Sequence, residues 1–550
     1  MTAGVFEQLL LAATALALVA VLGRAIPSLR TLPQRRTTLV LLGLLSAVLA
    51  IRYAVTTPTF IHANLHGAAL TESILDFPRR STARATYGQF SFLTLGLVAA
   101  IFGRVFEVVA ATNQLLSVAT LGLVAWLSAR LQRSMAAALW VLAAGSFHVA
   151  VLRVGGSEDA HNLALFLGAL ALVAADLYAE RQQLSSLAVM TLALVLMIHS
   201  RQTLYVWVPF AYLWIPARAD RPWRMLLEPA LSASAVVVAA ALGLRIIGTV
   251  SSESERTSFI VMAIIVRTPG AVLALLRHHP LFDVLRFGPW LGIGALAGFV
   301  LAVRRRGTRV LALAFVASFI VSLPTGWHTP GVEFSFRMPA LFLALVLAGL
   351  AGAKLFETYV RNRWLHLAML SSVALTPCLL PTWQDLHRES ADFQEYKHLR
   401  GQLAALPREV EVVQLSRRPS RPSVTPPVTL LRRAGIRARI TEPGTPALGV
   451  PRLLIPGIQC WGYGMAELVG FGDRSPNRVT TDELRRFMPV LFDGLLDGID
   501  LPGERPECQT LLRNATPVGT PGQIVDAPQD IPFVLYGHQP IPLQLYLLGP

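Results

Sequence analysis

Long runs of apolar residues recur along the first 380 residues of this chain and constrain its fold more than any other feature. About twelve such runs can be recognised, at residues 9–23, 39–54, 111–129, 135–152, 163–178, 184–198, 204–215, 230–244, 288–303, 310–323, 338–352 and 365–380. A helix needs about 20 apolar residues to cross a bilayer, and shorter runs must extend into their polar flanks. The pattern therefore predicts an α-helical polytopic membrane protein with about twelve spans. Its charged fraction of 15% agrees with this class, because soluble domains contain about 25% charged residues.

Basic residues are unevenly distributed over the loops between these runs. One alternating set of loops holds most of them: Arg24, Arg30, Arg35, Arg36, Arg130, Arg133, Arg181, Arg218, Arg221, Arg224, Arg304, Arg305, Arg306, Arg309, Lys354, Arg361 and Arg363. By the positive-inside rule this set is cytoplasmic, which places the segment 56–89 outside. The loops 153–161, 199–203, 248–287 and 325–337 also face outward on this topology. We interpret the run 90–103 as an interfacial or re-entrant helix, since counting it as a span would invert the order that follows.

The composition becomes that of a soluble protein after Pro381. We expect helices at residues 382–406 and 482–492, and strands at 410–415, 452–458 and 533–536, separated by proline-rich joints. The chain is thus divided into a membrane domain, residues 1–381, and a smaller C-terminal α/β domain, residues 382–550. An even number of spans places this second domain outside the cytoplasm.

Three cysteines are too few for a disulfide-rich scaffold. Cys460 and Cys508 both fall in the C-terminal domain, where they form either a disulfide bridge or two buried thiols, and the sequence leaves both open. Cys378, at the end of a predicted span, is expected to be free.

The formal net charge of +15 lies almost entirely in the membrane half. Basic loops interleaved with apolar helices offer no continuous groove for a phosphate backbone, so we expect no nucleic-acid partner. The charge instead reflects topology and contact with membrane lipids.

The outer segment 56–89 carries the first group of candidate site residues. His62, Asn64 and His66 could bind a phosphate or a metal ion, or supply a general base, although such residues are also common at membrane interfaces. Glu72 and Asp76 are four residues apart, which places both carboxylates on one face of a helix, where they could be a base and a metal ligand. The alternative is the solvated face of an amphipathic helix whose apolar side chains sit in lipid.

A second group follows the run 135–152, in the sequence R-V-G-G-S-E-D-A-H-N. Ser157 is predicted as an N-cap, with Glu158 and Asp159 in the first turn of the next helix, where the helix dipole favours negative charge. That structural role is sufficient by itself. The position at the outer face also allows Glu158 and Asp159 to hold a metal ion or an acceptor hydroxyl.

Two outward-facing arginines form the third group. Arg201 and Arg337 are each predicted at the outer end of a helix. An arginine there can bind a lipid phosphate through two N–H groups and stabilise it as a leaving group. The alternative is a side chain that extends to the lipid headgroups.

Residues 40 to 380 resemble the C-superfamily (GT-C) of membrane glycosyltransferases, which includes protein O-mannosyltransferases and aminoarabinose transferases. The resemblance rests on the outer loop after an early span and on four segments: Y-G-Q-F-S-F-L-T-L-G-L-V-A-A-I-F-G, W-L-S-A-R-L-Q-R-S, A-A-A-L-W-V-L-A-A-G-S-F-H-V-A-V-L-R-V-G-G-S-E-D and E-F-S-F-R-M-P-A-L-F-L-A-L-V-L-A-G-L.

This resemblance implies transfer of a sugar from a polyprenyl phosphate or related lipid carrier to a lipid, glycan or protein acceptor outside the cytoplasm. It further implies a base from a carboxylate of the first outer loop and basic residues at the lipid phosphate, and some members need a divalent metal ion. Such an enzyme would lie in the inner membrane of a bacterium. This chain departs from the family where members carry an early acidic residue, often D-E, because it reads T-P-T-F-I-H-A-N-L-H-G there.

The sequence hypothesis is therefore a membrane glycosyltransferase. Glu72, Asp76, Glu158 and His66 are its candidate catalytic residues. The candidate substrate-binding residues are His62, Asn64, Asp159, Arg201 and Arg337. Two other functions stay open: a transporter or flippase for lipid-linked glycans, and a non-catalytic relative that acts in envelope assembly.

Overall fold

The structure is a computed structural model that describes most of the N-terminal half and separate parts of the C-terminal half. The described residues are 3–29, 35–60, 66–75, 89–159, 161–218, 227–248, 289–322, 332–359, 362–379, 383, 385–389, 391–413, 431, 434–441, 445, 449–454, 506–520 and 545–548.

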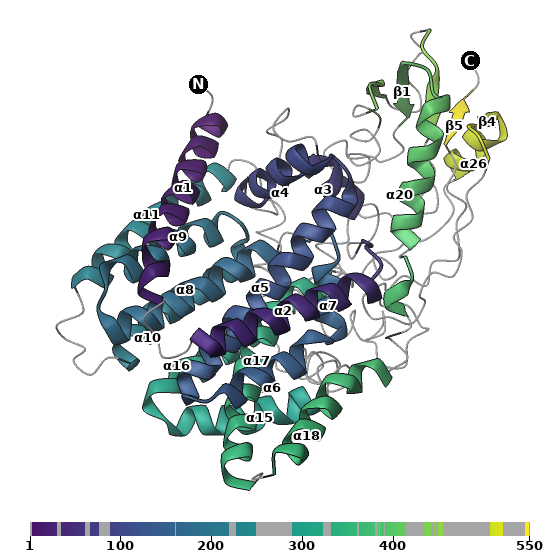
Figure 1. Ribbon diagram of the computed structural model, residues 1–550. Helices are drawn as coiled ribbons and strands as arrows, with labels where there is room; N and C mark the ends of the chain where they lie inside the picture. The colour runs from purple at the N-terminus through teal and green to yellow at the C-terminus, as the bar shows by residue number, and fades with distance from the viewer. Residues whose placement is uncertain are drawn as a thin grey trace, which may run out of the picture.

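The helices between residues 3 and 375 form a bundle (Figure 1). Its helices are α1 (Ala3–Leu29), α2 (Arg35–Val55), α3 (His66–Leu75), α4 (Gln89–Phe102), α5 (Phe106–Gln132), α6 (Met135–Ser146), α7 (Val149–Gly155), α8 (His161–Arg181), α9 (Leu184–Ile198), α10 (Trp207–Arg218), α11 (Leu227–Gly248), α15 (Pro289–Arg304), α16 (Arg309–Ser322), α17 (Val332–Tyr359) and α18 (Arg363–Leu375), and the 3-10 helix η1 (Gln202–Val206) precedes α10. Each predicted apolar run coincides with one or two of these helices.

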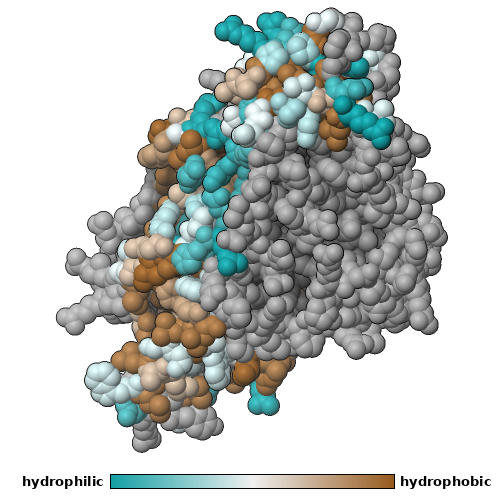
Figure 2. All heavy atoms as spheres, turned by 90° about the vertical axis from the view of Figure 1, so that its right-hand side faces the viewer, coloured by the Kyte–Doolittle hydropathy of each residue, from teal (hydrophilic) through white to brown (hydrophobic). Residues whose placement is uncertain are grey.

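The bundle has the properties of an integral membrane protein. Within the described residues, three helices are long and apolar enough to cross a bilayer, Phe106–Gln132, His161–Arg181 and Met338–Thr358, and α6 with α7 makes a fourth if the bent pair is one span. Large apolar side chains are exposed on α11, α15 and α18, as expected of helices that face lipid. Figure 2 shows hydrophobic residues towards the bottom of the molecule and hydrophilic residues at the top, around the C-terminal sheet. The number of about twelve spans stays a prediction.

The run 135–152, predicted as a single span, is two helices. The chain bends by 71° between α6 and α7, which leaves the carbonyl groups at the end of α6 without helical partners. Arg52 of α2 is fully buried and satisfies two of them, with its Nε 2.9 Å from the oxygen of Ser146 and its Nη2 3.2 Å from that of Gly145. A cation beside the carbonyl end of a helix also interacts favourably with the helix dipole. The bend turns α7 into the interior of the bundle.

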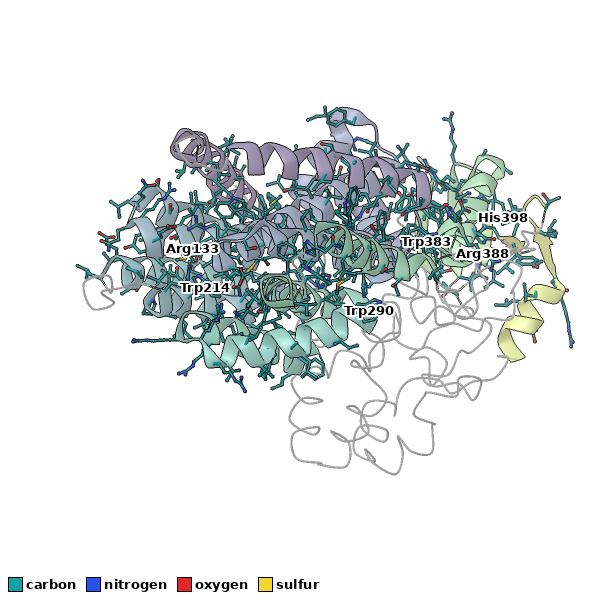
Figure 3. The ribbon with its side chains drawn as sticks, turned by 60° about the horizontal axis from the view of Figure 1, so that its bottom comes forward. Arg133, Trp214, Trp290, Trp383, Arg388 and His398 are labelled. Atoms are coloured by element: carbon teal, nitrogen blue, oxygen red, sulfur yellow. The ribbon has the colours of Figure 1, made fainter. Side chains whose placement is uncertain are left out.

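One end of the bundle gathers loops that the sequence predicts to be cytoplasmic. The buried carboxylate of Asp176 on α8 accepts hydrogen bonds from Arg130 Nε of α5, at 2.8 Å, and from Arg218 Nε of α10, at 3.1 Å. Figure 3 shows Arg133 at this end and Arg388 at the other end of the molecule. The described loops with basic residues thus lie together, and their orientation in the membrane stays a prediction.

The opposite end gathers segments that the sequence predicts to face outward. The amide of Thr59, just after α2, lies 3.3 Å from the oxygen of Gly156, and the amide of Phe90 in α4 lies 3.0 Å from the oxygen of His199. The helix α4 has 14 residues and is about 21 Å long at 1.5 Å per residue, shorter than the hydrocarbon core of about 30 Å. Its length fits the predicted interfacial or re-entrant helix.

A five-stranded mixed sheet lies in the C-terminal half, with the strand order β2-β1-β3-β5-β4. Its strands are β1 (Glu409–Val413), β2 (Arg437–Thr441), β3 (Arg452–Leu454), β4 (Ala515–Pro517) and β5 (Tyr546–Leu548), and the nearby helices are α20 (Ala391–Gln402) and α26 (Pro506–Arg513). The strands β2, β1 and β3 are parallel, whereas β5 is antiparallel to β3 and β4. The strands predicted at 410–415 and 452–458 are confirmed over residues 410–413 and 452–454, and their remaining residues lie outside the described part.

The remaining C-terminal predictions are tested only in part. The helix predicted at 382–406 is confirmed over α20. The helix predicted at 482–492, the strand at 533–536 and the Cys460–Cys508 pairing rest on residues or side chains outside the described part. Cys378 is free, as predicted. The division between residues 381 and 382 stays a prediction.

The helices α15 and α17 pack closely against each other at Gly298. A Cβ atom at Gly298 would lie 1.9 Å from the backbone oxygen of Leu347, whereas a Cβ atom at Gly43 of α2 would meet nothing within 4 Å. Gly298→Ala is expected to lower the free energy of unfolding by about 1–3 kcal/mol through overpacking. Gly43→Ala is the matched control, and it should be neutral or stabilising by up to about 1 kcal/mol through helix propensity. Thermal unfolding of both variants in detergent measures the difference, and equal melting temperatures would contradict the described packing.

Candidate functional site

The segment between α7 and α8 is a buried turn at the end of the bundle that the sequence predicts to face outward, which is called the outer end below. Ser157, Glu158 and Asp159 have relative exposures of 0%. The Ser157 hydroxyl donates to the oxygen of Val154 at 2.9 Å and accepts from the amide of Asp159 at 3.3 Å. The helix α8 begins at His161, so the prediction that Ser157 caps it and that Glu158 and Asp159 form its first turn is wrong. Asp159 instead accepts from the His161 amide at 3.0 Å through Oδ1, so a short local turn leads into the helix.

A chain of three polar side chains crosses from this turn to the end of α9. The Nδ1 atom of His161 lies 2.7 Å from Oδ1 of Asp159, and Nε of Arg201 donates to Nε2 of His161 at 2.9 Å. A guanidinium group has no acceptor, so Nε2 must accept and the ring proton must be on Nδ1. The geometry therefore requires a neutral imidazole that donates to Asp159 and accepts from Arg201. All three residues are at most 2% exposed.

Amide side chains hold the turn in place. Asn113 of α5 donates to the oxygen of Ser157 at 2.8 Å. Asn162, in the first turn of α8, donates to the oxygens of Val154 and Asp159 at 2.8 and 3.1 Å. Buried backbone oxygens without such partners would destabilise an apolar bundle. The backbone of the turn is therefore fixed by side chains from two helices.

The outer segment after α2 lies over this region through α3 and α4. Leu70, Ile74 and Leu75 of α3 are buried against apolar residues of α4 and α5, including Phe92 and Leu95. The predicted alternative, in which the apolar side of this helix sits in lipid, is therefore wrong for the described residues. The start of α4 bonds to the end of α9 through its backbone, so α3 is linked to the segment that carries Arg201.

Glu72 of α3 is buried, at 1% exposure, and accepts a hydrogen bond from the hydroxyl of Tyr396 on α20. Tyr396 belongs to a cluster of four aromatic rings with Phe60, Phe106 and Phe393, whose centroids lie 4.7–6.3 Å apart in the described pairs. Such edge-to-face and tilted pairs are favourable beyond the area they bury. The C-terminal half is thus packed directly on the outer end of the bundle.

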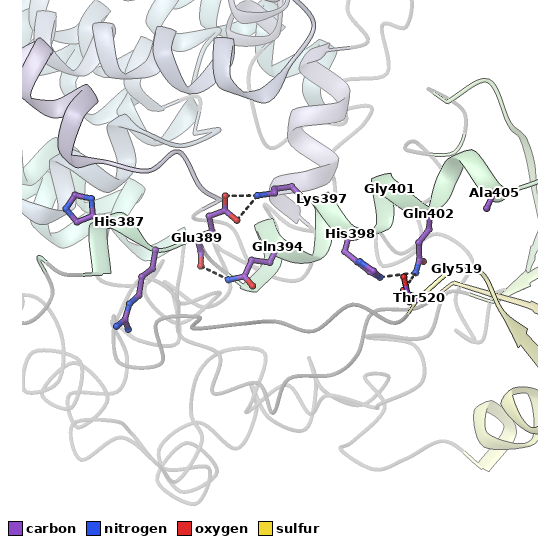
Figure 4. A pocket seen from close by; sticks show the side chains of 11 residues that line it. His387, Glu389, Gln394, Lys397, His398, Gly401, Gln402, Ala405, Gly519 and Thr520 are labelled. Atoms are coloured by element: carbon purple, nitrogen blue, oxygen red, sulfur yellow. Dashed lines mark hydrogen bonds and ion pairs between the residues drawn. The ribbon is translucent and has the colours of Figure 1, made fainter.

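The helix α20 has two different faces. Phe393, Tyr396 and Leu399 are buried in the apolar cluster, whereas Gln394, Lys397 and His398 line a polar cavity of about 800 Å³ (Figure 4). Residues three or four positions apart lie on the same face of a helix, so each of these two sets occupies a face of its own. The cavity also contains a bond between Lys397 and Glu389, with Nζ 2.8 Å from Oε1.

Residues just before α20 are bonded to the outer end of the bundle. The Thr57 hydroxyl lies 3.0 Å from the oxygen of His387, and both terminal nitrogens of Arg153 lie 3.2 Å from the oxygen of Arg388. His387 and Arg388 also line the polar cavity. Arg153 of α7, which precedes the buried turn, therefore links the bundle to the wall of the cavity.

The structure brings only some of the predicted residues together. Asp159 and Arg201 are joined through His161, and Glu158 lies in the same turn. Glu72 lies on another element, bonded to Tyr396. Three predicted residues lie outside the described part of the chain: His62, Asn64 and Asp76.

Two predicted residues are placed by their backbones. His66 is the first residue of α3. Arg337 lies inside α17, which begins at Val332, so the prediction that it marks the end of a helix is wrong. By contrast, Arg201 directly precedes η1 after the end of α9, as predicted.

Two residues of the described site were not predicted from the sequence, His161 and Tyr396. His161 stands within the R-V-G-G-S-E-D-A-H-N segment, two residues after Asp159, and this spacing is the only local signal for it. Its second partner, Arg201, is 40 residues away. Tyr396 is 324 residues from Glu72, and no pattern of spacing indicates that contact.

A divalent metal ion is not supported by the described part of the site. Among those residues, no group of three or more His, Cys, Asp or Glu side chains could hold a metal ion. Asp159 is already bonded to His161. No catalytic step is therefore assigned to a metal ion.

No family model matches the chain, and no curated protein matches it. The structure is similar to a crystal structure of ArnT from Cupriavidus metallidurans in the apo state. The two chains share 12% identity over 76% of this chain and 93% of the other, with a TM-score of 0.46. ArnT is an aminoarabinose transferase of the C-superfamily.

The required state of the His161 ring is directly measurable. In protein labelled with ¹⁵N-histidine, NMR is expected to show His161 protonated at Nδ1 and unprotonated at Nε2 at neutral pH, because Arg201 can only donate. A His161→Gln variant assigns the signal. A doubly protonated ring, or a ring protonated at Nε2, would contradict the arrangement.

Proposed function

We propose that the protein is a membrane glycosyltransferase that moves a sugar from a polyprenyl-phosphate donor to an acceptor outside the cytoplasm. The observation that carries this proposal is the buried polar layer at the predicted outer end of the bundle. In this layer Glu158 and Asp159 lie between α7 and α8, and Arg201 lies between α9 and η1. The sequence resemblance to the C-superfamily supports the same reaction class.

The chemistry of this transfer needs a base at the acceptor and positive charge at the leaving phosphate. Glu72 and Glu158 are the described candidates for the base, and Asp76 and His66 are the candidates in the same outer segment. Arg201 donates from its Nε to His161, and its guanidinium is the group proposed to bind the phosphate oxygens of the donor. Asp159 and His161 orient that guanidinium. Arg337 is the second cation proposed for the phosphate, and His62 and Asn64 are the other candidate substrate-binding residues.

Burial determines how a substrate can reach these groups. Glu72, Glu158 and Arg201 are at most 2% exposed, so a donor contacts them only after the outer segments move apart. When these segments close again over the bound donor, they exclude water from the reacting centre. The exclusion of water strengthens electrostatic interactions there and limits hydrolysis of the donor.

The transporter alternative is less well supported. Proton-coupled transporters place ionisable residues near the middle of their spans. Among the described residues, the buried Arg201 and Asp176 lie near the two ends of the bundle, and the buried Arg52 lies at the break between α6 and α7. An acid–cation pair near one end fits chemistry at the membrane face better than a path through the membrane.

Substitution of the proposed groups tests the reaction. With purified protein in lipid vesicles, the measured quantity is sugar transfer from a polyprenyl-phosphate-linked donor. Loss of the general base should lower the rate about 10²–10⁴-fold, so at least one of Glu72→Gln and Glu158→Gln is expected to show this loss. Arg201→Gln should lower it about 10²–10³-fold through lost stabilisation of the phosphate, and Arg201→Lys should restore part of the activity.

Two charged residues away from the site serve as matched controls. Glu180→Gln removes a half-exposed carboxylate at the opposite end of the bundle, and Arg305→Gln removes an exposed arginine there. Both variants should keep wild-type activity. Undiminished transfer by both carboxylate variants would refute the described base, and translocation of the donor without any transfer would identify a transporter.

A further inference from the structure

The Glu72–Tyr396 hydrogen bond joins the outer segment of the bundle to the C-terminal half. The hydroxyl of Tyr396 donates to Oε1 of Glu72, and the two residues are 2% and 1% exposed. An ionised carboxylate only accepts hydrogen bonds, so the phenol holds the proton between them. A hydrogen bond in a buried environment restricts the carboxylate to few orientations.

The position of Tyr396 is itself set by the bundle. Its ring lies 5.2 Å from that of Phe60, which follows α2, and Phe60 and Phe393 are 5.0 Å apart. Phe106, the first residue of α5, lies 4.7 Å from Phe393. Three elements of the bundle therefore determine where α20 lies: the segment after α2, the start of α5, and α3 through Glu72.

Backbone contacts fix the segment that leads into α20. The amide of Thr57 donates to the oxygen of Leu386 at 3.0 Å, and Arg153 holds the oxygen of Arg388. Arg153 belongs to α7, directly before the turn with Glu158. The C-terminal half is thus connected to both candidate bases, to one by a direct hydrogen bond and to the other through α7.

We propose that Tyr396 is a positioning residue for Glu72, so that the C-terminal half completes the catalytic site instead of only flanking it. This inference rests on the proposed function with Glu72 as the base. Tyr396 acts through the carboxylate, because its hydroxyl holds Glu72 in one orientation. No bond forms or breaks at Tyr396 during the transfer.

A double-mutant cycle on the full-length protein tests the inference. Tyr396→Phe removes only the hydroxyl and keeps the ring in its aromatic cluster. It is expected to lower kcat by up to about 100-fold, the effect of a small misplacement of a reacting group, with little change in KM for the donor. In the Glu72→Gln background, the same substitution should change kcat less than about twofold, because the group that it positions is already absent.

The control is Tyr546→Phe. Tyr546 lies on β5 and packs against C-terminal residues, so its hydroxyl should be dispensable for transfer. Wild-type kcat in Tyr396→Phe, together with a strong loss in Glu72→Gln, would overturn the inference and leave the proposed function standing. Equal losses from Tyr396→Phe in both backgrounds would also overturn it, because they would show a structural effect independent of Glu72.

Failure of the proposed function would be seen elsewhere. It would show as absence of transfer by the wild-type protein, or as full activity of both Glu72→Gln and Glu158→Gln. Full activity of Glu72→Gln with loss of activity in Glu158→Gln would overturn the inference and leave the proposed function standing. Thermal unfolding of the wild type, Tyr396→Phe, Glu72→Gln and the double variant checks the contact without any activity assay. The inference predicts that the two substitutions are not additive in melting temperature, and additive shifts would overturn it.

Discussion

Backbone oxygens inside an apolar bundle need hydrogen-bond partners. The bend between α6 and α7 leaves the carbonyl groups of Gly145 and Ser146 without helical partners, so they need partners from another element. The buried guanidinium of Arg52 meets this need. The bend turns the chain by 71° and sends α7 into the interior. The turn that follows, with Glu158 and Asp159, is therefore buried within the bundle and lies beside Arg201. Without the bend, an apolar run of this length would continue as a straight span and carry these carboxylates to the surface.

Buried charge imposes the second constraint. An isolated ion in a medium of low polarity is strongly destabilised, so buried carboxylates and guanidinium groups must be paired. Asp159 and Arg201 each bond to one nitrogen of a neutral imidazole, which lies between the two ions. Glu72 is satisfied by a phenol from a distant part of the chain. These contacts fix the polar groups in advance, which is what electrostatic stabilisation of a transition state requires.

The sequence predicts the bundle well because apolar runs report helices directly, and each of the twelve runs coincides with described helices. It does not reveal the break within residues 135–152, because hydropathy is continuous across it. Local turn chemistry was predicted with the wrong residue: Asp159, not Ser157, bonds to the first amide of α8. The contacts that assemble the site are tertiary. Periodicity describes one element at a time, so it could not pair Glu72 with Tyr396.

The central claim is that the buried layer around Arg201 binds the phosphate of a lipid carrier. The most direct measurement is an experimental structure of the protein in lipid nanodiscs with polyprenyl phosphate bound. The account predicts phosphate oxygens within hydrogen-bonding distance of the Arg201 guanidinium, about 2.7–3.2 Å, with the outer segments opened around the lipid. A phosphate bound at the opposite end, near Arg130 and Arg218, or along the lipid-facing surface, with the Asp159–His161–Arg201 chain closed and unchanged, would contradict it.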